Sequence, residues 1–381
     1  MLPRRNDNIF SPSQRIIFGA PGTGKSFKID DPEKGYGLEN VDKSRKFRTT
    51  FHPDYDYAQF VGAYKPMPVD TKTRKTEITY SFVPQVFAKA YTKAWEKYFS
   101  TSDTLTAENQ VYLVIEEINR GNCAQIFGDI FQLLDRVDEG EDKGFSRYSI
   151  DADSDFAEWL KTDSVLSESS IWTAYEKLVG AGKLKLPPNL NILATMNTSD
   201  QSLFPMDGAF KRRFDWEYVP IRYKAQKNEN GDKIDKNWDA DEYTISFNNI
   251  EKKDDKEKTK LTFHWIKFLK KVNADIYKVT ESEDKQMGEF FIKPKNEKKV
   301  ISHKEFRSKV LFYLWDSVYK DETDRNVIFH FKYPDDNGSV VTFQRLFEDD
   351  FESILIKMLE KLDNTYKGEE FEDFKILENN P

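Results

Sequence analysis

Hydrophobic and polar residues alternate in blocks over residues 15–222, and the blocks follow two different periods. Short continuous apolar runs are typical of strands buried on both faces of a sheet, whereas apolar positions three or four residues apart are typical of helices. The pattern predicts strands at 15–18 (RIIF), 44–53 (SRKFRTTFHP), 110–117 (QVYLVIEE) and 190–198 (LNILATMNT). It predicts helices at 83–99, 123–137 and 205–214, and a turn or short helix in the aromatic-rich stretch 54–66.

The alternation of strands and helices predicts an α/β fold for residues 1–222, with a mainly parallel sheet flanked by helices. One stretch of this domain, residues 138–185, is polar and contains a single helical pattern at 171–182. We expect that stretch to be an insertion into the core.

The composition changes at residue 223. A polar stretch at 224–242 predicts a linker or flexible loop. Two strongly amphipathic stretches, 263–277 and 303–319, follow it. We therefore expect residues 223–381 to form a linker and a smaller, mainly helical second domain.

Charge and composition narrow the class of protein. The 381-residue chain has a net charge of -8, and residues 321–381 hold 16 acidic and 7 basic residues, so the rest of the chain is close to neutral. This excludes an overall basic surface for nucleic acid but leaves room for a local basic groove. No apolar run approaches membrane-spanning length, and the single cysteine, Cys123, cannot form an internal disulfide. We expect a cytoplasmic protein with no membrane partner.

The first candidate for chemistry is the sequence GAPGTGKS, which fits G-x-x-x-x-G-K-[ST] at every fixed position. Its glycines let backbone N–H groups turn toward a phosphate, and the helix that follows presents its positive end to the same anion. The lysine supplies charge to the β- and γ-phosphates, and the serine hydroxyl binds Mg²⁺. The alternative is a glycine-rich turn with an incidental lysine. The predicted nucleotide-binding residues are Gly19, Ala20, Pro21, Gly22, Thr23, Gly24, Lys25 and Ser26.

Two adjacent glutamates, Glu116 and Glu117, end the apolar run LVIEE. Ionised groups beside a core are costly unless something pairs with them. In a unit that already holds a phosphate loop, the first carboxylate suits a magnesium ion and the second suits the attacking water. We assign Glu116 to the metal and Glu117 to the water, with a solvated acidic turn as the alternative.

Several longer stretches carry a family resemblance. In order, they are GAPGTGKS, FHPDYDYAQFVGAYKP, LVIEEINRGNCAQIFGDIFQLLDR, LPPNLNILATMNTSDQSLFPMDGAFKRRFDW, QMGEFF and FYLWDSVYKD. Together they resemble the AAA+ NTPases, and more narrowly the McrB branch of the dynein-related group, the motor subunit of modified-cytosine restriction systems. The resemblance implies a P-loop AAA+ core with a helical lid, and Mg²⁺-dependent hydrolysis of ATP or GTP.

The resemblance also implies roles for four further residues. Asn197 matches sensor 1, which helps to hold the attacking water, and Asp200 matches the acidic position of the M-N-T-x-D signature. Arg212 and Arg213 match the arginine fingers, which neutralise transition-state charge in the neighbouring subunit's site. The alternatives are an amide that caps a turn, for Asn197, and favourable basic charge at a helix C-terminus, for the arginines.

Fingers that act in trans imply a homo-oligomeric ring, expected to be a hexamer. The implied partner is an McrC-like nuclease subunit, and we expect any contact with DNA to come through the complex rather than a dedicated domain of this chain. Two positions depart from McrB proper, which has aspartate in place of Glu116 and arginine in place of Gln201. Because most AAA+ proteins use ATP, we expect ATP as the substrate, with GTP as the close alternative.

Three functions remain in view. The leading one is an NTP-driven ring motor of a DNA restriction or anti-phage complex. The alternatives are a MoxR-like ATPase chaperone that remodels proteins, and a non-catalytic nucleotide-dependent scaffold, against which the intact catalytic residues argue. The lid is expected to supply a sensor 2 residue from among Lys285, Lys293 and Arg307. Three aromatic residues are expected to pack in the core, with substrate contact in the pore of a ring as the alternative: Tyr55, Tyr57 and Phe60.

Overall fold

The computed structural model describes residues 12–70, 76–101, 105–199, 204–225, 227, 233, 238–252, 255–321, 343–347, 351–367, 371 and 377–379. By backbone contacts the chain divides into two compact units. The first unit comprises Met1–Phe18 and Lys25–Tyr218, and the second comprises Gly19–Gly24 and Val219–Pro381.

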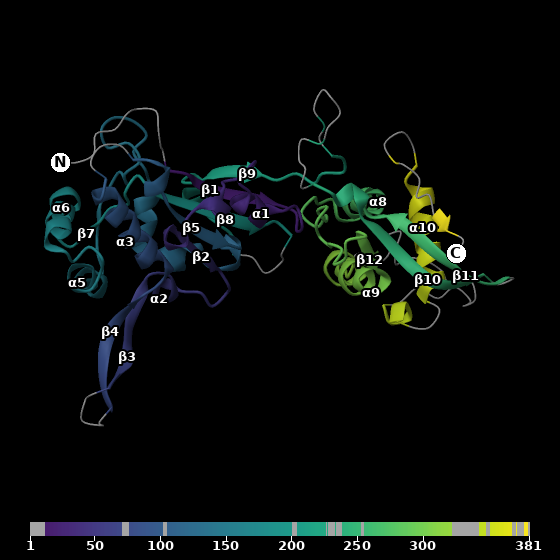
Figure 1. Cartoon of the computed structure of the whole chain (residues 1–381), viewed down its shortest axis with the longest axis horizontal. Helices are drawn as coiled ribbons and strands as arrows, with labels where there is room; N and C mark the ends of the chain where they lie inside the picture. The colour runs from purple at the N-terminus through teal and green to yellow at the C-terminus, as the bar shows by residue number, and fades with distance from the viewer. Residues whose placement is uncertain are drawn as a thin grey trace. The chain divides into compact units, whose positions relative to one another are not determined.

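A five-stranded sheet forms the centre of the first unit, with the strand order β2-β5-β8-β1-β9 (Figure 1). The pairs β2–β5, β5–β8 and β1–β9 are parallel, so the carboxyl ends of paired strands meet at one edge. The predicted α/β fold with a mainly parallel sheet is confirmed. The strands are β1 (Gln14–Gly19), β2 (Lys46–Thr50), β5 (Val111–Glu116), β8 (Leu190–Asn197) and β9 (Asp215–Tyr218).

Helices pack on this sheet because their apolar residues recur on one face. In α3 the side chains of Phe87, Tyr91 and Trp95 are fully buried in the core of the unit. Tyr55 and Phe60 are buried in the same core and Tyr57 packs against it, which supports core packing over contact in a pore. The helices of the first unit are α1 (Lys25–Asp30), α2 (Tyr57–Phe60), α3 (Val86–Phe99), α4 (Cys123–Phe127), α5 (Ser154–Thr162), α6 (Ser169–Val179) and α7 (Gly208–Lys211).

Two parts of the first unit differ from the sequence pattern. Residues 138–185 contain two helices, α5 and α6, where the pattern predicted one, and a short antiparallel pair, β6 (Ile150–Asp151) and β7 (Lys183–Leu184). The predicted helix at 123–137 is α4 followed by a 3₁₀ segment, Gly128–Leu134. Gly128 adopts a positive φ of 49° at this junction, which breaks the regular helix.

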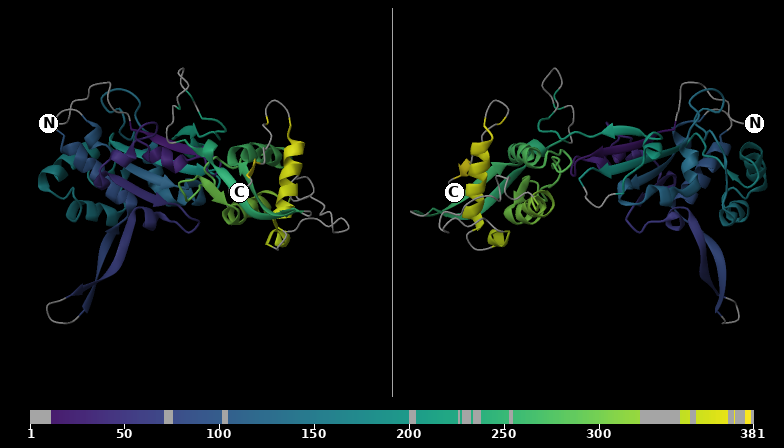
Figure 2. Two further views of the ribbon diagram at one scale, coloured as in Figure 1. Left: turned by 45° about the vertical axis from the view of Figure 1, so that its right-hand side comes forward. Right: turned by 180° about the vertical axis from the view of Figure 1, so that it is seen from behind.

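A long hairpin, β3 (Gly62–Asp70) with β4 (Thr76–Pro84), projects from the body of the first unit (Figure 2). The sequence pattern predicted only a turn or short helix over 54–66, and prolines, present here at 66 and 68, are uncommon within strands. Both prolines lie in a two-stranded ribbon, where a strand has an outer edge that needs no hydrogen-bond donor. Tyr64, Ile78 and Tyr80 are exposed on this hairpin.

The second unit contains the predicted amphipathic helices and a sheet that was not predicted. The sheet has the order β12-β10-β11-β13, with β10 antiparallel to β11 and parallel to β12. Its strands are β10 (Thr244–Lys252), β11 (Asp255–His264), β12 (Val300–Ser302) and β13 (Leu377–Asn379). The helices are α8 (Trp265–Thr280), α9 (His303–Glu305) with π-helical continuations at Phe306–Leu311 and Leu314–Val318, and α10 (Phe351–Thr365).

The second unit has its own core, in which Trp238, Trp265 and Phe268 are nearly or fully buried. Within the described ranges of the whole chain, no helix combines the length and the apolar character needed to cross a membrane.

Candidate nucleotide site

The loop between β1 and α1 has a shape that requires glycine. Gly22 and Gly24 adopt φ values of 82° and 87°, a left-handed conformation that side chains with a Cβ rarely adopt. The hydroxyl of Thr23 donates to the carbonyl of Ala20 at 3.0 Å and closes the loop on itself. Helix α1 begins at Lys25, which is only 7% exposed. The loop lies between a strand and a helix, which is the position that its motif requires, and its binding of phosphate stays a prediction.

At the start of α1 the side chain of Ser26 meets the end of β5. Its hydroxyl donates to Oε2 of Glu116 at 2.9 Å, although the two residues lie 90 positions apart in the sequence. A hydroxyl and a carboxylate are both hard oxygen ligands of the kind that Mg²⁺ prefers. The two predicted metal ligands are thus together, and their chemistry fits that ion.

Glu117 lies directly after β5 in a left-handed conformation, with φ 54° and ψ 49°. Such values are uncommon for a residue other than glycine and persist only where the surroundings enforce them. Here the surroundings do so from β8: Nδ2 of Asn197 donates to Oε1 of Glu117, and Oγ1 of Thr195 accepts from its backbone N–H at 3.2 Å. A regular strand would direct these adjacent side chains to opposite faces, and the turn at Glu117 lets both glutamates contact side chains of β8.

Thr195 was not among the residues predicted from the sequence. Its hydroxyl donates to Oε2 of Glu116 while it accepts from the backbone N–H of Glu117, so one side chain links both carboxylate residues. The sequence signal was a hydroxyl within the apolar run ILATM of a buried strand. We call Ser26, Glu116, Glu117, Thr195 and Asn197 the strand-end cluster.

Three other residues surround this cluster, and the sequence assigned none of them a role. Asn119, only 3% exposed, donates through Nδ2 to the carbonyl of Asn197 at 2.8 Å and so fixes the end of β8. Arg48 on β2 places Nη1 3.6 Å from Oε1 of Glu116, and Arg120 places Nε 3.7 Å from Oε2 of Glu117. These contacts put positive charge beside both carboxylates. Asp200 and Gln201 lie outside the described residues.

The two adjacent arginines that follow α7, Arg212 and Arg213, have different surroundings. The side chain of Arg213 is 9% exposed, donates to Asp135 at 2.6 Å and to the carbonyl of Ala209 at 2.9 Å, and lies over the ring of Phe131. Arg212 is exposed. The sequence pattern does not distinguish the two arginines.

Comparison with known proteins identifies the family. A model of the AAA domain, dynein-related subfamily, matches residues 14–214, which is more than half of the chain and includes every member of the strand-end cluster. The chain belongs to the dynein-related AAA family.

Two curated proteins are similar to this AAA chain. The component YdiS of the type II restriction enzyme BsuMI from Bacillus subtilis is 33% identical over 327 residues, which cover 81% of this chain and 80% of YdiS. The EcoKMcrB subunit of a type IV methyl-directed restriction enzyme from Escherichia coli is 26% identical over 200 residues, which cover 52% of this chain and 33% of that protein. Among solved structures, a putative ATPase from Cytophaga hutchinsonii matches 55% of this chain and 42% of its own at 12% identity, with a TM-score of 0.29, which is too low to bear on the fold.

In this AAA chain the loop residues Gly19–Gly24 belong to the second compact unit. Another segment of that unit donates hydrogen bonds to them. The backbone N–H of Gly288 donates to the carbonyl of Pro21, and that of Phe290 to the carbonyl of Gly22, both at 2.8 Å. A methyl group on Gly288 would lie 2.3 Å from the carbonyl carbon of Gly22, so no larger residue fits here without a shift. We call Met287–Phe291 the bracket segment.

Buried polar groups fix the bracket segment. Asn273 of α8, 1% exposed, donates to the carbonyl of Met287 at 2.8 Å and accepts from its N–H at 2.9 Å. The carboxylate of Glu289, fully buried, accepts from Nε of Arg222 at 2.9 Å and from the indole of Trp238 at 3.2 Å. Burial of a charge requires such pairing, so these contacts define one position for the segment.

The candidates for sensor 2 are engaged within the second unit. Nζ of Lys293 lies 4.5 Å from the centre of the Phe290 ring. Arg307 donates to the carbonyl of Leu346 at 3.0 Å. These contacts select neither residue, nor Lys285, for a role at the nucleotide.

The single cysteine of the chain is a buried residue. Cys123 is buried at the start of α4, and burial raises the pKa of its thiol to about 12. Its reactive thiolate form is therefore scarce at neutral pH.

Proposed function

We propose that this chain hydrolyses a nucleoside triphosphate at the strand-end cluster. The observation that carries the proposal is the contact of Glu117 with Asn197, made by a glutamate held in a strained backbone conformation one residue after the Ser26–Glu116 pair. Strain of this kind concentrates at functional sites. If Glu117 belonged only to a solvated acidic turn, the contacts from β8 that hold its left-handed conformation would have no function.

Each part of the loop has a role in binding the phosphates. The backbone N–H groups of Gly19–Gly24 surround the phosphates, and Lys25 supplies charge to the β- and γ-phosphates. Ser26 and Glu116 would hold Mg²⁺, which neutralises charge on the β- and γ-oxygens. Thr195 keeps the Glu116 carboxylate in place through its hydroxyl. Arg48 places Nη1 3.6 Å from Oε1 of that carboxylate.

Glu117 orients the attacking water and takes up its proton as the water oxygen bonds to the γ-phosphorus. The bond between that phosphorus and the oxygen that bridges it to the β-phosphate breaks, and the nucleoside diphosphate leaves. Asn197 can hold the carboxylate of Glu117 through Nδ2 and, as sensor 1, help to position the same water. Asn119 holds the backbone of Asn197 in position, because its side chain donates a hydrogen bond to the Asn197 carbonyl. Asp200 is proposed as a further acidic member of the site from the family signature alone.

We assign the trans-acting finger to Arg212. Its exposure lets it reach a neighbouring subunit, whereas Arg213 is occupied by Asp135, Ala209 and Phe131 within its own chain. Arg213 then supports the position of Arg212 rather than entering the neighbour's site. Sites completed in trans require a homo-oligomeric ring, which we propose is a hexamer.

We further propose that the ring is the cytoplasmic motor of a DNA restriction or anti-phage complex with an McrC-like nuclease subunit. Support comes from the names of both curated relatives, which are components of restriction enzymes. A MoxR-like chaperone is the second candidate, because that function uses the same class of AAA domain. A non-catalytic scaffold is disfavoured by the complete strand-end cluster. The relatives leave the base open, and we propose ATP, with GTP as the alternative.

Steady-state hydrolysis of ATP and of GTP, with and without the product of the neighbouring gene, tests this proposal. We expect Mg²⁺-dependent turnover of one nucleotide and strong stimulation by a nuclease subunit. Turnover that is stimulated by an unfolded or cofactor-free protein instead would favour the chaperone. Tight nucleotide binding with no turnover under any of these conditions would overturn the proposal in favour of a scaffold.

A further inference from the structure

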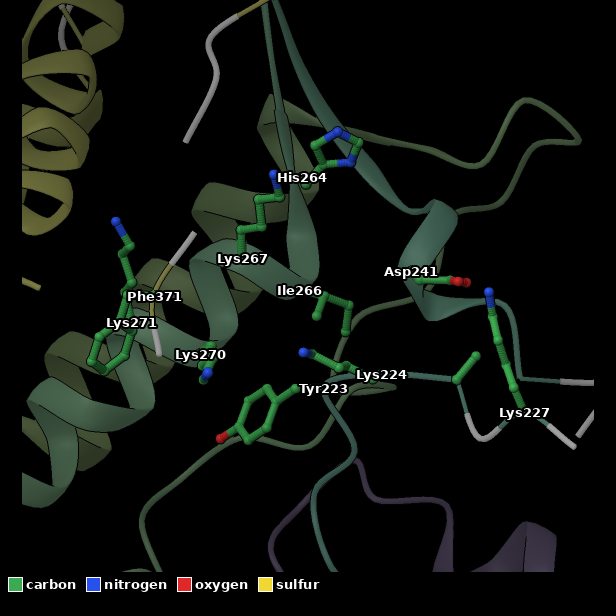
Figure 3. Close-up of a pocket in the computed structure, with 11 residues that line it drawn as sticks. Tyr223, Lys224, Lys227, Asp241, His264, Ile266, Lys267, Lys270, Lys271 and Phe371 are labelled. Atoms are coloured by element: carbon green, nitrogen blue, oxygen red, sulfur yellow. The ribbon is translucent and has the colours of Figure 1, made fainter. Parts of the chain in front are cut away.

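Polar and charged side chains also make contacts away from the strand-end cluster and the bracket segment. In the second unit, Lys271 lies in the wall of a cavity of about 1010 Å³ (Figure 3) and is paired with Asp363, which compensates its charge. In the first unit, Arg136 contacts Gln14, which in turn contacts the end of the segment that carries Arg212. The contacts in the first unit therefore reach the proposed finger.

Gln14, at the start of β1, uses both ends of its side-chain amide. The residue is only 7% exposed. Its Nε2 donates to the carbonyl of Leu134 at 2.9 Å and also to the carbonyl of Arg213, and its Oε1 accepts from Nε of Arg136 at 3.4 Å. A rotated amide would place its oxygen against two carbonyl oxygens, so these contacts define one orientation of the group.

Arg136 holds the amide of Gln14 in that orientation. Its Nη1 donates to the carbonyls of Gly144 and Pro187, both at 3.0 Å, and its Nη2 donates to the carbonyl of Leu190 at 3.1 Å. Hydrogen bonds from a charged donor are stronger than those between neutral groups. The guanidinium is thus fixed by backbone and in turn fixes Oε1 of Gln14, which leaves Nε2 to bind the carbonyl after Arg212.

A second side chain binds the carbonyl before Arg212. The indole Nε1 of Trp216 donates to the carbonyl of Lys211 at 2.9 Å, and its ring packs edge-on against Phe18 at 5.6 Å. Carbonyls in the last turn of a helix have no partner within the helix. Helix α7 ends at Lys211 with Arg212 as its C-cap, so Gln14 and Trp216 supply donors on both sides of Arg212.

The same contacts place the backbone near Arg212 at the amino ends of the strands. The carbonyl of Arg213 lies beside the start of β1, where the carbonyl of Ser13 accepts from the N–H of Ile192 in β8. The strand-end cluster lies at the other end of β8, at Asn197, and five residues of a strand span roughly 16 Å. This is longer than an arginine side chain, which favours action of Arg212 on a neighbouring subunit's site.

We propose that Gln14 and Trp216 are positioning residues for Arg212, and that they fix the backbone on its two sides while its side chain is exposed to a neighbouring subunit. The proposal rests on the proposed function, since it takes Arg212 as the finger that acts in trans. A group that stabilises the transition state must be in place before the reaction, and a shift of about 1 Å can cost about a hundredfold in rate.

The test measures kcat and nucleotide Kd of two variants of the full chain. Gln14→Met keeps the length of the side chain and removes the amide, so kcat should fall by about tenfold or more while Kd changes less than about twofold. Trp216→Phe keeps a ring against Phe18 and removes one donor from an exposed residue, so the fold is at little risk and kcat should fall by about two- to tenfold.

Two matched controls should keep kcat within about twofold of the unchanged chain. Gln110→Met removes the amide of another buried glutamine of the first unit, which accepts from Asn191 rather than holding the finger. Trp315→Phe changes a tryptophan of the second unit that is 36% exposed, as Trp216 is.

A double variant separates positioning from a general loss of structure. Gln14→Met/Arg212→Ala should be no slower than Arg212→Ala alone, because Gln14 acts through Arg212. A structural defect would lower the rate of Arg212→Ala further, by the factor that Gln14→Met shows alone. The double variant Trp216→Phe/Arg212→Ala should behave in the same way, and it decides the question if Gln14→Met does not fold.

Mixed preparations give a second readout of the same kind. Gln14→Met mixed with Lys25→Ala should recover part of the turnover, because the fingers of the Lys25→Ala subunits then serve intact sites. Gln14→Met mixed with Arg212→Ala should recover none, since both subunits have a defective finger.

The outcomes distinguish this inference from the proposed function. If Gln14→Met and Trp216→Phe match their controls, or if each change multiplies the defect of Arg212→Ala, the inference is wrong and hydrolysis stands. Full turnover in Arg212→Ala would remove the finger, and with it this inference, while hydrolysis again stands. No turnover in the unchanged chain would overturn the proposed function and the inference together.

Discussion

The strand-end cluster and the bracket segment both depend on buried polar contacts. In the cluster these contacts position side chains, and in the bracket segment they position backbone. In the first unit, Thr195 and Asn197 of β8 hold two side chains that follow β5, Glu116 and Glu117. In the second unit, Asn273 and the Glu289–Arg222 pair hold a stretch of backbone, which in turn donates hydrogen bonds to the phosphate loop. The cluster positions side chains, whereas the bracket segment positions the backbone of the phosphate loop.

This difference predicts two separable kinds of defect. Changes in the strand-end cluster should lower turnover and leave nucleotide binding largely intact, because they act on groups that matter in the transition state. Changes in the bracket segment should lower nucleotide affinity first, because they act on the loop. The predictions below set these two behaviours against each other.

The largest effect should come from the exposed arginine. Arg212→Ala should lower turnover by about a thousandfold or more, the range measured for arginine fingers, with little change in Tm. Arg213→Ala should instead lower stability by about 2 kcal/mol, between the values for exposed and buried ion pairs, because it leaves Asp135 without its partner. Steady-state kinetics and thermal unfolding of both variants check the assignment.

Mixing adds a test of the shared site. Arg212→Ala mixed with Lys25→Ala should recover part of the activity, because some interfaces then join an intact loop to an intact finger. If no mixing ratio restores turnover, or if Arg213→Ala alone behaves as a finger mutant with unchanged Tm, the assignment of Arg212 is wrong.

Thr195→Val should have the next largest effect. The change keeps the shape of the side chain but removes the hydroxyl that binds both Glu116 and the N–H of Glu117. A lost bond to a charged or buried group costs about 1–3 kcal/mol, so kcat should fall by about ten- to a hundredfold with nucleotide Kd little changed. Thr92→Val, a buried threonine of α3 that bonds only to its own helix, is the matched control. Equal effects of the two changes would remove Thr195 from the site.

Gly288→Ala should show the opposite pattern. The added methyl group would lie 2.3 Å from the carbonyl carbon of Gly22, so the bracket segment must move away from the loop. We expect nucleotide affinity to fall by about tenfold, since two hydrogen bonds of about 1 kcal/mol each are disturbed. Isothermal titration with a non-hydrolysable nucleotide measures this. Gly208→Ala, where the methyl group meets nothing within 4 Å, should bind normally, and normal binding by Gly288→Ala as well would show that the bracket has no effect on the loop.

The smallest expected effect is on the pH dependence of folding stability, through Glu217 of the first unit. Burial raises the pKa of Glu217, but its contacts with Lys28, Tyr36 and Arg15 outweigh this and lower the pKa below its usual 4.5. A lowered pKa stabilises the folded state above the ordinary pKa, and that contribution disappears as pH falls through the folded value. Glu217→Gln should therefore lose stability at pH 7 and show less further loss between about pH 5 and 3 than the unchanged chain. Parallel acid-unfolding curves would contradict this.

Sequence alone predicted most of the strand-end cluster because its members follow a local rule. A phosphate loop and a strand that ends in acids are each visible within a few residues, and a parallel sheet brings strand ends to one edge. The role of Asn197 was implied by the family resemblance. Thr195 escaped because a threonine in a buried strand is ordinary by composition. Its contacts with Glu116 and Glu117 become visible only once the pairing of β8 with β5 is known.

The bracket and the hairpin could not be predicted in the same way. Asn273 and Met287 are 14 positions apart, and Glu289 and Arg222 are 67 apart, so only the folded chain shows that they meet. Prolines such as those of β3 are uncommon within strands, and the ribbon's outer edge made them acceptable. Adjacent arginines such as Arg212 and Arg213 are indistinguishable in sequence, and only burial separates them.

The most direct test of the central claim is Glu117→Gln, with nucleotide binding and turnover measured on the same preparation. Glutamine keeps the size of the side chain but cannot accept the proton, so turnover should fall by about a hundredfold or more while nucleotide Kd changes less than about twofold. Glu108→Gln, an exposed glutamate of the same unit, should leave both unchanged. Normal turnover in Glu117→Gln would show that Glu117 does not act on the water, and the strand-end cluster would lose its catalytic role.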